Sequence, residues 1–573
     1  MHKKVIAIVG CGPRGLAALE ELFKEISNFK TSIDFEVILF ETSKNLGTGK
    51  AWDLDQPNSN WINISDFALQ ELEGRVKISF DSFSVPSFPS YRDWCLANGF
   101  QKASEKDKDV YPPRSVMGTY LNERFNSIFD ILKENNLVSH YSEEIVDLQK
   151  SDNKIKLIST ESSYDVDECL LTIGHQPTEL SEESQTWKNH AERRKCVYIH
   201  DPYESEIADN NWDHKEIAIK GFGLSMIDIC RMLTTCRGGG FREKPDSKFL
   251  KYLKTGDEVK IYPFSLDGLP VVPKPYGRKV DSYFQPSKRQ VKHFELKIEN
   301  HLVEPEKIEN IDFLVSAFAS ISAEIYSEME TPYTKGNYEN EEIEKLIKDW
   351  LNDMDTKHAL ILDTSMPTRD YMEKTVSMAN GESAFSLDYT VGQIWRQLQP
   401  TMYRLFAHSG LKGEVMKEIV DLDESTKRYS YGPPVESILQ LLALMDADVL
   451  DLRFIKDPET DLHEKGWKLR RENESVVANV MINSILAGPD IEKMDSTIIK
   501  KLKKNLQIEQ VESGLGIATE SSGLILVENY NSQIPVAVLG RNSKGSILGT
   551  DAILECFSPE IELWAQGVVE RIS

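Results

Sequence analysis

The stretch VIAIVGCGPRGLAAL, residues 5–19, decides the fold. An apolar run typical of a strand leads directly into Gly-x-Gly-x-x-Gly, and apolar residues with helical spacing follow. This context predicts the strand, turn and helix that open a dinucleotide-binding fold. In such a turn Gly10 permits the tight bend, Gly12 lets a pyrophosphate approach the backbone, and Gly15 lets the helix pack close to the strand. The positive end of the helix dipole then faces the phosphates.

A second predicted strand, residues 35–40, ends on Glu41. A carboxylate at this point accepts hydrogen bonds from the ribose of a bound dinucleotide. Glu41 follows Gly15 by 26 residues, somewhat more than the usual spacing of about 20, and an extended loop over residues 24–34 accounts for the excess. The alternative is an ordinary strand–helix turn, but the motif, its flanking elements and the terminal acid all favour nucleotide binding.

Length and composition indicate a globular protein of several domains. The chain has 573 residues, of which 40% are hydrophobic and 28% charged, and a typical domain takes about 100–200 residues. The sequence has no apolar run of the roughly 18 residues that a membrane span needs. Only four residues precede the first strand, which leaves no room for a signal peptide, so we expect a cytoplasmic protein. The sequence predicts no oligomeric state.

Charge and cysteine usage exclude several classes of function. Lys and Arg number 67 against 92 Asp and Glu, a net charge of −25, which disfavours nucleic-acid or membrane partners. The seven cysteines include no Cys-x-x-Cys pair, which argues against a disulfide reductase. No His, Cys and Glu cluster has the spacing of metal ligands, so we expect no metal.

Two further positions in the N-terminal third are candidates for ligand contact. Asn63 lies in a loop rich in glycine and aromatic residues, where its amide would hydrogen-bond a flavin ring or cap its own turn. Arg114 follows two prolines at the start of a predicted helix. A cation is disfavoured at a helix start, so a neighbouring phosphate would explain it. The alternative for Arg114 is a solvent-facing side chain.

A second strand–glycine–helix unit occupies residues 217–228. It has Gly221 and Gly223, but Met226 stands where the third glycine is expected. The larger side chain would push the helix from the strand and loosen contact with a nucleotide. The next predicted strand, residues 259–264, leads to Asp267. A carboxylate there accepts hydrogen bonds from an unphosphorylated ribose and repels a 2′-phosphate, which favours NADH over NADPH.

The remaining chain completes a plan of two α/β domains and a helical insertion. Helical periodicity dominates residues 304–427, a strand is predicted over residues 449–455, and the last strands lie near residues 524–527 and 536–541. We therefore predict an α/β fold with two three-layer, Rossmann-like domains built on parallel sheets. The first dinucleotide-binding domain comprises residues 1–180 and 500–573, the second such domain residues 195–300 and 430–499, and the helical insertion or cap residues 301–429.

The chain resembles FAD/NAD(P)-binding flavoproteins, in plan similar to class B flavin monooxygenases and N-hydroxylating monooxygenases. The matching segments are GCGPRG at 10–15 with Glu20, GTGKAW at 47–52, Pro-Arg at 113–114 with GTYL at 118–121, TIGHQP at 172–177, GFGLSMID at 221–228, YGPP at 431–434 and LGR at 539–541. The chain departs from the family after the second strand of the second unit, where SLD at 265–267 replaces an arginine-rich patch.

The resemblance implies FAD in the first fold, a nicotinamide cofactor in the second, and terminal strands that return to the FAD domain. It implies a ribityl contact for Asp551 and, with the motifs above, these candidate cofactor-binding residues: Gly10, Gly12, Pro13, Arg14, Gly15, Glu41, Thr48, Trp52, Asn63, Arg114, Gly174, Gly221, Gly223, Ser225, Asp267, Gly540 and Asp551. Catalytic residues are unknown from sequence, with Asn63 a weak candidate beside the flavin.

Three functions stay open on the sequence, since a flavin carries the redox chemistry and requires no visible catalytic triad. The first is an NAD(P)H-using flavin monooxygenase that acts on a small molecule. The second is an FAD-dependent dehydrogenase or reductase without oxygenation. The third is a non-catalytic nucleotide-binding or sensor protein, which Met226 and the missing arginines favour.

Overall fold

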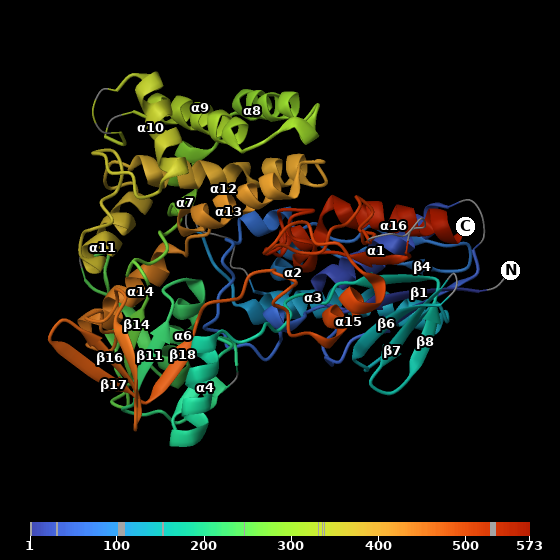
Figure 1. Cartoon of the computed structure of the whole chain (residues 1–573), viewed down its shortest axis with the longest axis horizontal. Coiled ribbons are helices and arrows are strands. Elements are labelled where there is room, and N and C mark those ends of the chain that lie inside the picture. Colours follow the sequence, from blue (N-terminus) through green and yellow to red (C-terminus); the bar gives the residue numbers. More distant parts are fainter. Residues whose placement is uncertain are drawn as a thin grey trace.

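The computed structural model describes residues 3–29, 33–100, 109–151, 154–204, 206–245, 247–330, 332–334, 336, 338–527 and 534–573. Two parallel sheets with helices packed on them, joined by a large helical part, make up the molecule (Figure 1). This arrangement confirms the predicted α/β fold with two Rossmann-like sheets.

The first sheet has the strand order β19-β9-β1-β2-β5, and every neighbouring pair is parallel. Its strands are β1 (Lys4–Val9), β2 (Phe35–Phe40), β5 (Val138–Tyr141), β9 (Glu168–Leu171) and β19 (Val536–Val538). Because parallel strands are covered on both faces, their sequences are continuously apolar rather than alternating. The late strand β19 therefore belongs to the same sheet as the N-terminal strand β1.

Alternate residues of β1 enter two different cores, which makes this part a three-layer structure. Ile6 and Ile8 pack with α1, α3 and α16, whereas Ala7 and Val9 face the other side. The helices of the first face are α1 (Pro13–Asn28), α3 (Arg114–Glu134) and α16 (Pro559–Ile572). The other face is covered by α15 (Thr497–Leu506) and an antiparallel sheet of β6 (Ile145–Ser151), β7 (Lys154–Ser159) and β8 (Ser163–Val166).

The second sheet has the strand order β10-β18-β11-β14 and is also parallel. Its strands are β10 (Val197–Ile199), β11 (Glu216–Lys220), β14 (Lys260–Phe264) and β18 (Val480–Asn483). One face packs against α4 (Glu182–Arg194) and the antiparallel strands β15 (Glu459–His463), β16 (Gly466–Arg471) and β17 (Glu474–Ala478). The other face packs against α6 (Leu224–Thr234) and the helical part.

The helical part stands above both sheets in Figure 1 and shares one continuous core with the second sheet. Its helices are α7 (Gly277–Asp281), α8 (Lys288–His301), α9 (Asp312–Glu328), α10 (Asn340–Asn352), α11 (Thr368–Ala379), α12 (Leu387–Phe406), α13 (Gly413–Ser430) and α14 (Val435–Asp446). Smaller elements are α2 (Tyr91–Ala97), α5 (Glu206–Asp209) and the hairpins β3 (Ile78–Ser79) with β4 (Ser84–Val85) and β12 (Gly240–Glu243) with β13 (Leu250–Leu253).

Two sequence-based expectations about strands are wrong. Residues 449–455 form no strand, and their backbone joins the second sheet through the isolated bridges of Leu450 with Ile261 and Lys456 with Ser265. Residues 524–527 likewise make isolated bridges rather than a strand. Among the described residues, no helix is long and apolar enough to span a membrane.

A buried carboxylate clamps the first layer of helices. Glu20 on α1 accepts hydrogen bonds from Arg124 Nη2 on α3 at 2.6 Å and from Arg75 Nη1 at 3.0 Å. All three side chains are less than 10% exposed. Since one carboxylate compensates two buried guanidinium groups, its loss would leave both arginines without an anion.

We expect Glu20→Ala to lower the free energy of unfolding by about 3–5 kcal/mol, the usual cost of breaking a buried ion pair. Chemical denaturation monitored by circular dichroism measures this change. The matched control is Glu21→Ala, which removes the neighbouring, partly exposed partner of Lys24 and should cost less than about 1 kcal/mol. Equal losses of unfolding free energy in the two variants would contradict a stabilising role of the buried Glu20 carboxylate.

Candidate functional site

A cavity of about 1980 Å³ lies where both parallel sheets and the helical part meet. Typical ligand pockets measure about 300–1,000 Å³, so this one has room for more than one ligand. Ligands of open α/β sheets bind outside the carboxyl ends of the strands. The predicted residues that line the cavity are Trp52, Asn63, Arg114, Gly221, Gly223, Ser225, Asp267 and Asp551.

The first glycine turn has the geometry that a pyrophosphate requires. A methyl group on Gly10 would lie 2.6 Å from Thr172 O, and one on Gly15 would lie 2.3 Å from Gly10 O. These two glycines are therefore closed in by backbone. A methyl group on Gly12 would make only an ordinary van der Waals contact, with Gly49 Cα at 3.6 Å, so Gly12 is less closely packed than Gly10 or Gly15. The turn fits a dinucleotide in the way that the three glycines predict.

Glu41 stands at the carboxyl end of β2, beside the glycine turn. Its Oε2 accepts a hydrogen bond from Cys11 N at 3.0 Å and its Oε1 accepts one from Ser43 N at 2.9 Å. Each carboxylate oxygen has a second lone pair, so the group can still accept the hydroxyl groups of a ribose. The two backbone hydrogen bonds thus hold the Glu41 carboxylate beside the glycine turn, and both of its oxygens can still accept further hydrogen bonds.

Several buried amide oxygens near the cavity have no hydrogen-bond partner, namely Asn60 Oδ1, Asn63 Oδ1 and Asn542 Oδ1. Asn63 donates its Nδ2 hydrogen to Tyr431 O at 3.0 Å, and Asn542 donates to Gly174 O at 3.0 Å. Buried polar atoms without partners are rare, and a ligand is one way to satisfy them. These acceptors support a bound group that carries N–H or O–H donors, as FAD does.

The second glycine turn keeps the same plan despite Met226. Gly221 has φ +110° and a methyl group there would lie 2.4 Å from Ser484 Oγ, whereas one on Gly223 would meet nothing within 4 Å. Ser225 Oγ lies 3.3 Å from Tyr203 OH. The side chain of Met226 is fully buried in the core that α6 shares with the helical part. The open position of Gly223 fits a nucleotide phosphate.

Arg114 does not face solvent; it joins the two glycine units. Its Nη2 donates to Asp228 Oδ2 on α6 at 2.7 Å and to Tyr203 OH at 3.2 Å, and its guanidinium lies 4.8 Å from the Tyr203 ring centroid. Burial acts to lower the pKa of Arg114, but the neighbouring Asp228 carboxylate outweighs it and raises the pKa. Arg114 also lines the cavity, so a role toward a phosphate stays a prediction.

Asp267 lies just after β14, as predicted, but it is already paired. Its Oδ2 forms an ion pair with Arg428 from α13, and its Oδ1 accepts Leu269 N at 3.1 Å. Both residues and Lys456 line the cavity. Arg237, which precedes the three glycines at 238–240, lies 3.6 Å from Asp213 and does not line the cavity. The sequence missed Arg428 because it belongs to a helix far from β14 in the chain.

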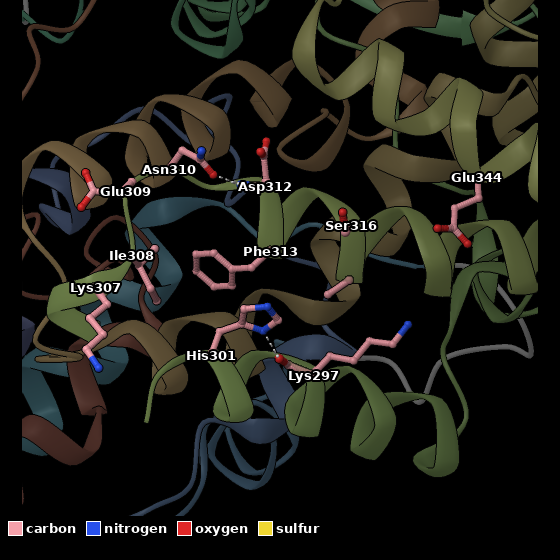
Figure 2. A pocket seen from close by; sticks show the side chains of 11 residues that line it. Lys297, His301, Lys307, Ile308, Glu309, Asn310, Asp312, Phe313, Ser316 and Glu344 are labelled. Carbon is pink, nitrogen blue, oxygen red and sulfur yellow. Dashed lines mark hydrogen bonds between the residues drawn. The ribbon is translucent and has the colours of Figure 1, made fainter. Parts of the chain in front are cut away.

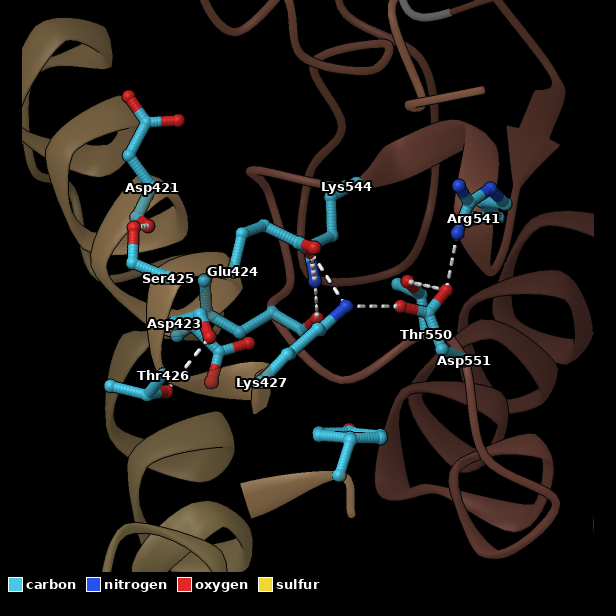
Figure 3. Close-up of polar contacts among 12 residues, drawn as sticks. Asp421, Asp423, Glu424, Ser425, Thr426, Lys427, Arg541, Lys544, Thr550 and Asp551 are labelled. Carbon is cyan, nitrogen blue, oxygen red and sulfur yellow. Dashed lines mark hydrogen bonds and ion pairs between the residues drawn. The ribbon is translucent and has the colours of Figure 1, made fainter. Parts of the chain in front are cut away.

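Asp551 belongs to a charged network where α13 meets the C-terminal loop (Figure 3). Lys427 Nζ lies 3.0 Å from Asp551 Oδ2 and 2.7 Å from Glu424 Oε1, and Arg541 Nη1 contacts Asp551 Oδ1. Burial opposes ionisation of Asp551, but Lys427 and then Arg541 hold its pKa well below the ordinary value. Lys427 and Tyr431 also line the cavity, and nothing in their local sequence marked them as site residues.

The other predicted residues support the first turn rather than line the cavity. Thr48 is fully buried and donates to Asn45 O at 2.8 Å. Arg14 reaches the C-terminal loop, donating to Glu555 O at 3.0 Å, and packs on Gly540. Pro13 begins α1, and Gly174 (φ +62°) ends the segment after β9.

A smaller hollow of about 650 Å³ lies on the surface of the helical part (Figure 2). His301 and Phe313 stack at its floor with ring centroids 5.4 Å apart, between α8 and α9. It is remote from both glycine turns, so the chemistry implied by the sequence belongs to the larger cavity.

Comparison with known proteins agrees with this geometry. Residues 7–176 match the family model described as FAD-NAD(P)-binding. The chain is 21% identical over 575 residues to an L-aspartate N-monooxygenase (nitrosuccinate-forming) of Streptomyces davaonensis, a match that covers 87% of this chain and 85% of that protein.

A second relative matches over a shorter region. A nitrosuccinic acid synthase of Aspergillus oryzae is 24% identical over 270 residues, which is 46% of this chain and 40% of that protein. Among solved structures, L-lysine 6-monooxygenase from Pseudomonas syringae superposes with a TM-score of 0.49 at 9% identity, with 100% of each chain covered.

The resemblance predicted from the motifs is confirmed. Residues 7–176 form an FAD/NAD(P)-binding domain, and the chain is an FAD-dependent oxidoreductase.

Lys274 is a partly buried cation whose neighbour Asn63 lines the cavity. Its Nζ donates to the backbone carbonyl of Asn63. Desolvation, and then the neighbouring Arg396, lower the pKa of Lys274 to about 7, although Asp281 and Asp109 oppose the shift. The unfolded chain would hold this proton up to about pH 10. Between pH 7 and 10 it therefore binds more protons than the folded chain, and stability rises with pH across this window.

We expect Lys274→Met to raise the melting temperature most at pH 6, where the partly buried lysine is charged, and progressively less as the pH rises toward 9. The underlying free-energy difference should change by up to about 1.4 kcal/mol per pH unit above pH 7. Thermal melts of both proteins at pH 6, 7, 8 and 9 test this. Lys279→Met, an exposed position on α7, is the control, and a parallel pH profile for the two variants would refute the assignment.

Proposed function

We propose that this chain is an FAD-dependent N-monooxygenase that oxygenates the amino group of a small, carboxylate-bearing amino acid, with a nicotinamide as reductant. The observation that carries the proposal is the cavity between the two sheets, which the open second glycine turn lines together with Lys427, Arg428 and Arg541. Each of these three cations is paired with a carboxylate of the same wall. The match to an L-aspartate N-monooxygenase over 87% of this chain supports the same reaction class.

The sheet order indicates which end of the cavity meets the flavin ring. Glu41 follows β2 on one side of β1, whereas Gly174 and Gly540 follow β9 and β19 on the other. A dinucleotide with its ribose at Glu41 and its pyrophosphate at Gly12 extends its other half toward β9 and β19. That half then reaches the wall of Asn63, Tyr431 and Asp551.

FAD, when bound, would supply the redox chemistry, in which two electrons from the nicotinamide and one O₂ give an oxygenated substrate nitrogen and one water. The residues of the chain orient the substrate and exclude water. Desolvation acts to lower the pKa of Lys427, but Asp551 and then Glu424 outweigh it and raise the pKa, so the ammonium stays charged. A substrate carboxylate that displaced Asp551 would pair with this ammonium and with Arg541, both of which now bind Asp551.

Two tyrosines close the same wall. Tyr403 OH and Tyr431 OH lie 3.0 Å apart, and burial raises the pKa of both hydroxyls well above the ordinary value. They therefore remain neutral, and they add hydrogen-bonding capacity beside the cations without adding negative charge. This arrangement suits a small anion better than an apolar substrate.

The decisive experiment follows isotopic oxygen. Purified protein with FAD, NADH or NADPH and L-aspartate or another anionic amino acid is incubated under ¹⁸O₂, and the product is analysed by mass spectrometry. One ¹⁸O atom on the substrate nitrogen supports the proposal. Nicotinamide oxidation without labelled product, across acidic, basic and neutral amino acids, would favour the alternative of a reductase without oxygenation.

Gly12→Val tests the placement of FAD. The branched side chain would fill the space through which the pyrophosphate approaches the backbone, so we expect the variant to purify without flavin. The absorbance ratio at 450 and 280 nm measures flavin content. Gly240→Val is the control, because Gly240 lies in β12 without a positive φ and an added methyl group there meets nothing within 4 Å. Full flavin content in Gly12→Val would show that this turn does not hold the cofactor.

Lys427→Met tests the carboxylate anchor. A hydrogen bond to a charged group contributes about 1.5–3 kcal/mol, so the KM for the anionic substrate should rise about 10–100-fold while flavin content stays constant. Lys417→Met on the same helix is the control, because Lys417 pairs with Asp421 away from the cavity. An unchanged KM in steady-state kinetics would show that Lys427 does not bind the substrate carboxylate.

A further inference from the structure

The second nucleotide site receives an arginine from the helical part. Asp267 follows β14, the strand beside the open turn of Gly221 and Gly223, and all three residues line the cavity. In a dinucleotide-binding fold this position meets the adenosine ribose. Arg428, which lies in the last turn of α13, reaches the same point and pairs with the Asp267 carboxylate.

This ion pair is accessible from the cavity rather than sealed in the core. The side chains of Arg428 and Asp267 are 31% and 43% exposed. The pKa of Arg428 is raised by Asp267, against the effect of burial, so the guanidinium stays charged. Lys456 lies next to Gly268 on the same wall, since a methyl group on Gly268 would be 3.0 Å from Lys456 Cβ. Arg428 and Lys456 therefore both line the wall at the expected ribose position, together with the carboxylates of Asp267 and Asp457.

We propose that Asp267 masks a latent 2′-phosphate site formed by Arg428 and Lys456, and that this pair selects the nicotinamide cofactor. With Asp267 present, the Arg428 charge is compensated, and the carboxylate accepts the hydroxyl groups of an unphosphorylated ribose. A 2′-phosphate would approach a carboxylate in a partly desolvated site, which is unfavourable. Without Asp267, Arg428 becomes free for the bidentate contact that guanidinium groups make with phosphates.

The proposal rests on the proposed function only in requiring a nicotinamide at the second glycine turn, and binding measures it without turnover. The probes are 2′,5′-ADP and 5′-AMP, which differ by the 2′-phosphate alone, titrated into FAD-loaded protein by isothermal calorimetry. We expect wild type to bind 5′-AMP at least as tightly as 2′,5′-ADP. Asp267→Ala should shift the affinity ratio at least tenfold toward 2′,5′-ADP.

Two further variants make the test specific. In Asp267→Ala/Arg428→Ala the shift toward 2′,5′-ADP should be lost. If Asp267→Ala only widened the site, the shift would persist in the double variant. Asp461→Ala removes a similarly exposed carboxylate from an ion pair with Arg470 on β15 and β16, outside the cavity, and should leave the ratio unchanged.

Each remaining outcome overturns the proposal in a recognisable way. An unchanged affinity ratio in Asp267→Ala, with both probes still bound, would refute the proposal that Asp267 blocks a 2′-phosphate site. It would not contradict the proposed N-monooxygenase activity. A shift that persists in the double variant assigns the phosphate contact to residues other than Arg428. Failure of both probes to bind any form places the nicotinamide outside the second glycine turn, and thereby also contradicts the site on which the proposed function depends.

Discussion

The ion pair between Arg114 and Asp228 fixes how the two nucleotide-binding units face each other. It joins the start of α3, on the first unit, to α6, on the second. Asp228 also lies 3.4 Å from Arg231, whose guanidinium stacks 3.9 Å from the Trp61 ring centroid and bonds Ser437 on α14. Buried charges are costly unless they are paired, so this chain of contacts permits few relative orientations. The carboxyl ends of the two sheets consequently open into one cavity.

Local sequence was sufficient to predict both nucleotide-type units. In each, the strand, the glycine turn and the helix are consecutive in the chain, and the positive φ of Gly10 and Gly221 needs only the glycine itself. Even Met226 did not disturb the second unit, because the helix buries it in a core made by the helical part. The predicted strand over residues 449–455 failed because its apolar residues fill that core without a continuous ladder to β14.

The candidate site could be predicted only in part, because many of its contacts join distant segments. Asp267 was predicted as a free carboxylate, but its charge is balanced by Arg428, which helical periodicity alone marks as an ordinary helix residue. The ion pair of Lys427 with Asp551 likewise joins segments far apart in the chain and could not be predicted. For Asn63 the sequence left a flavin contact and a turn cap open. The structure gives it a bond to Tyr431 O and an unpaired Oδ1, a combination that no local pattern encodes.

The position of β19 also bears on how the protein is made. Val536 pairs with Cys169 of β9, and Arg571 bonds Glu168 of the same strand. At about 5–20 residues per second, a ribosome needs roughly 20–70 s to deliver β19 after β9 has emerged. During that interval β9 is an apolar edge strand, the kind of surface that invites aggregation. We therefore expect nascent chains to depend on chaperones, and flavin to be acquired only after synthesis is complete.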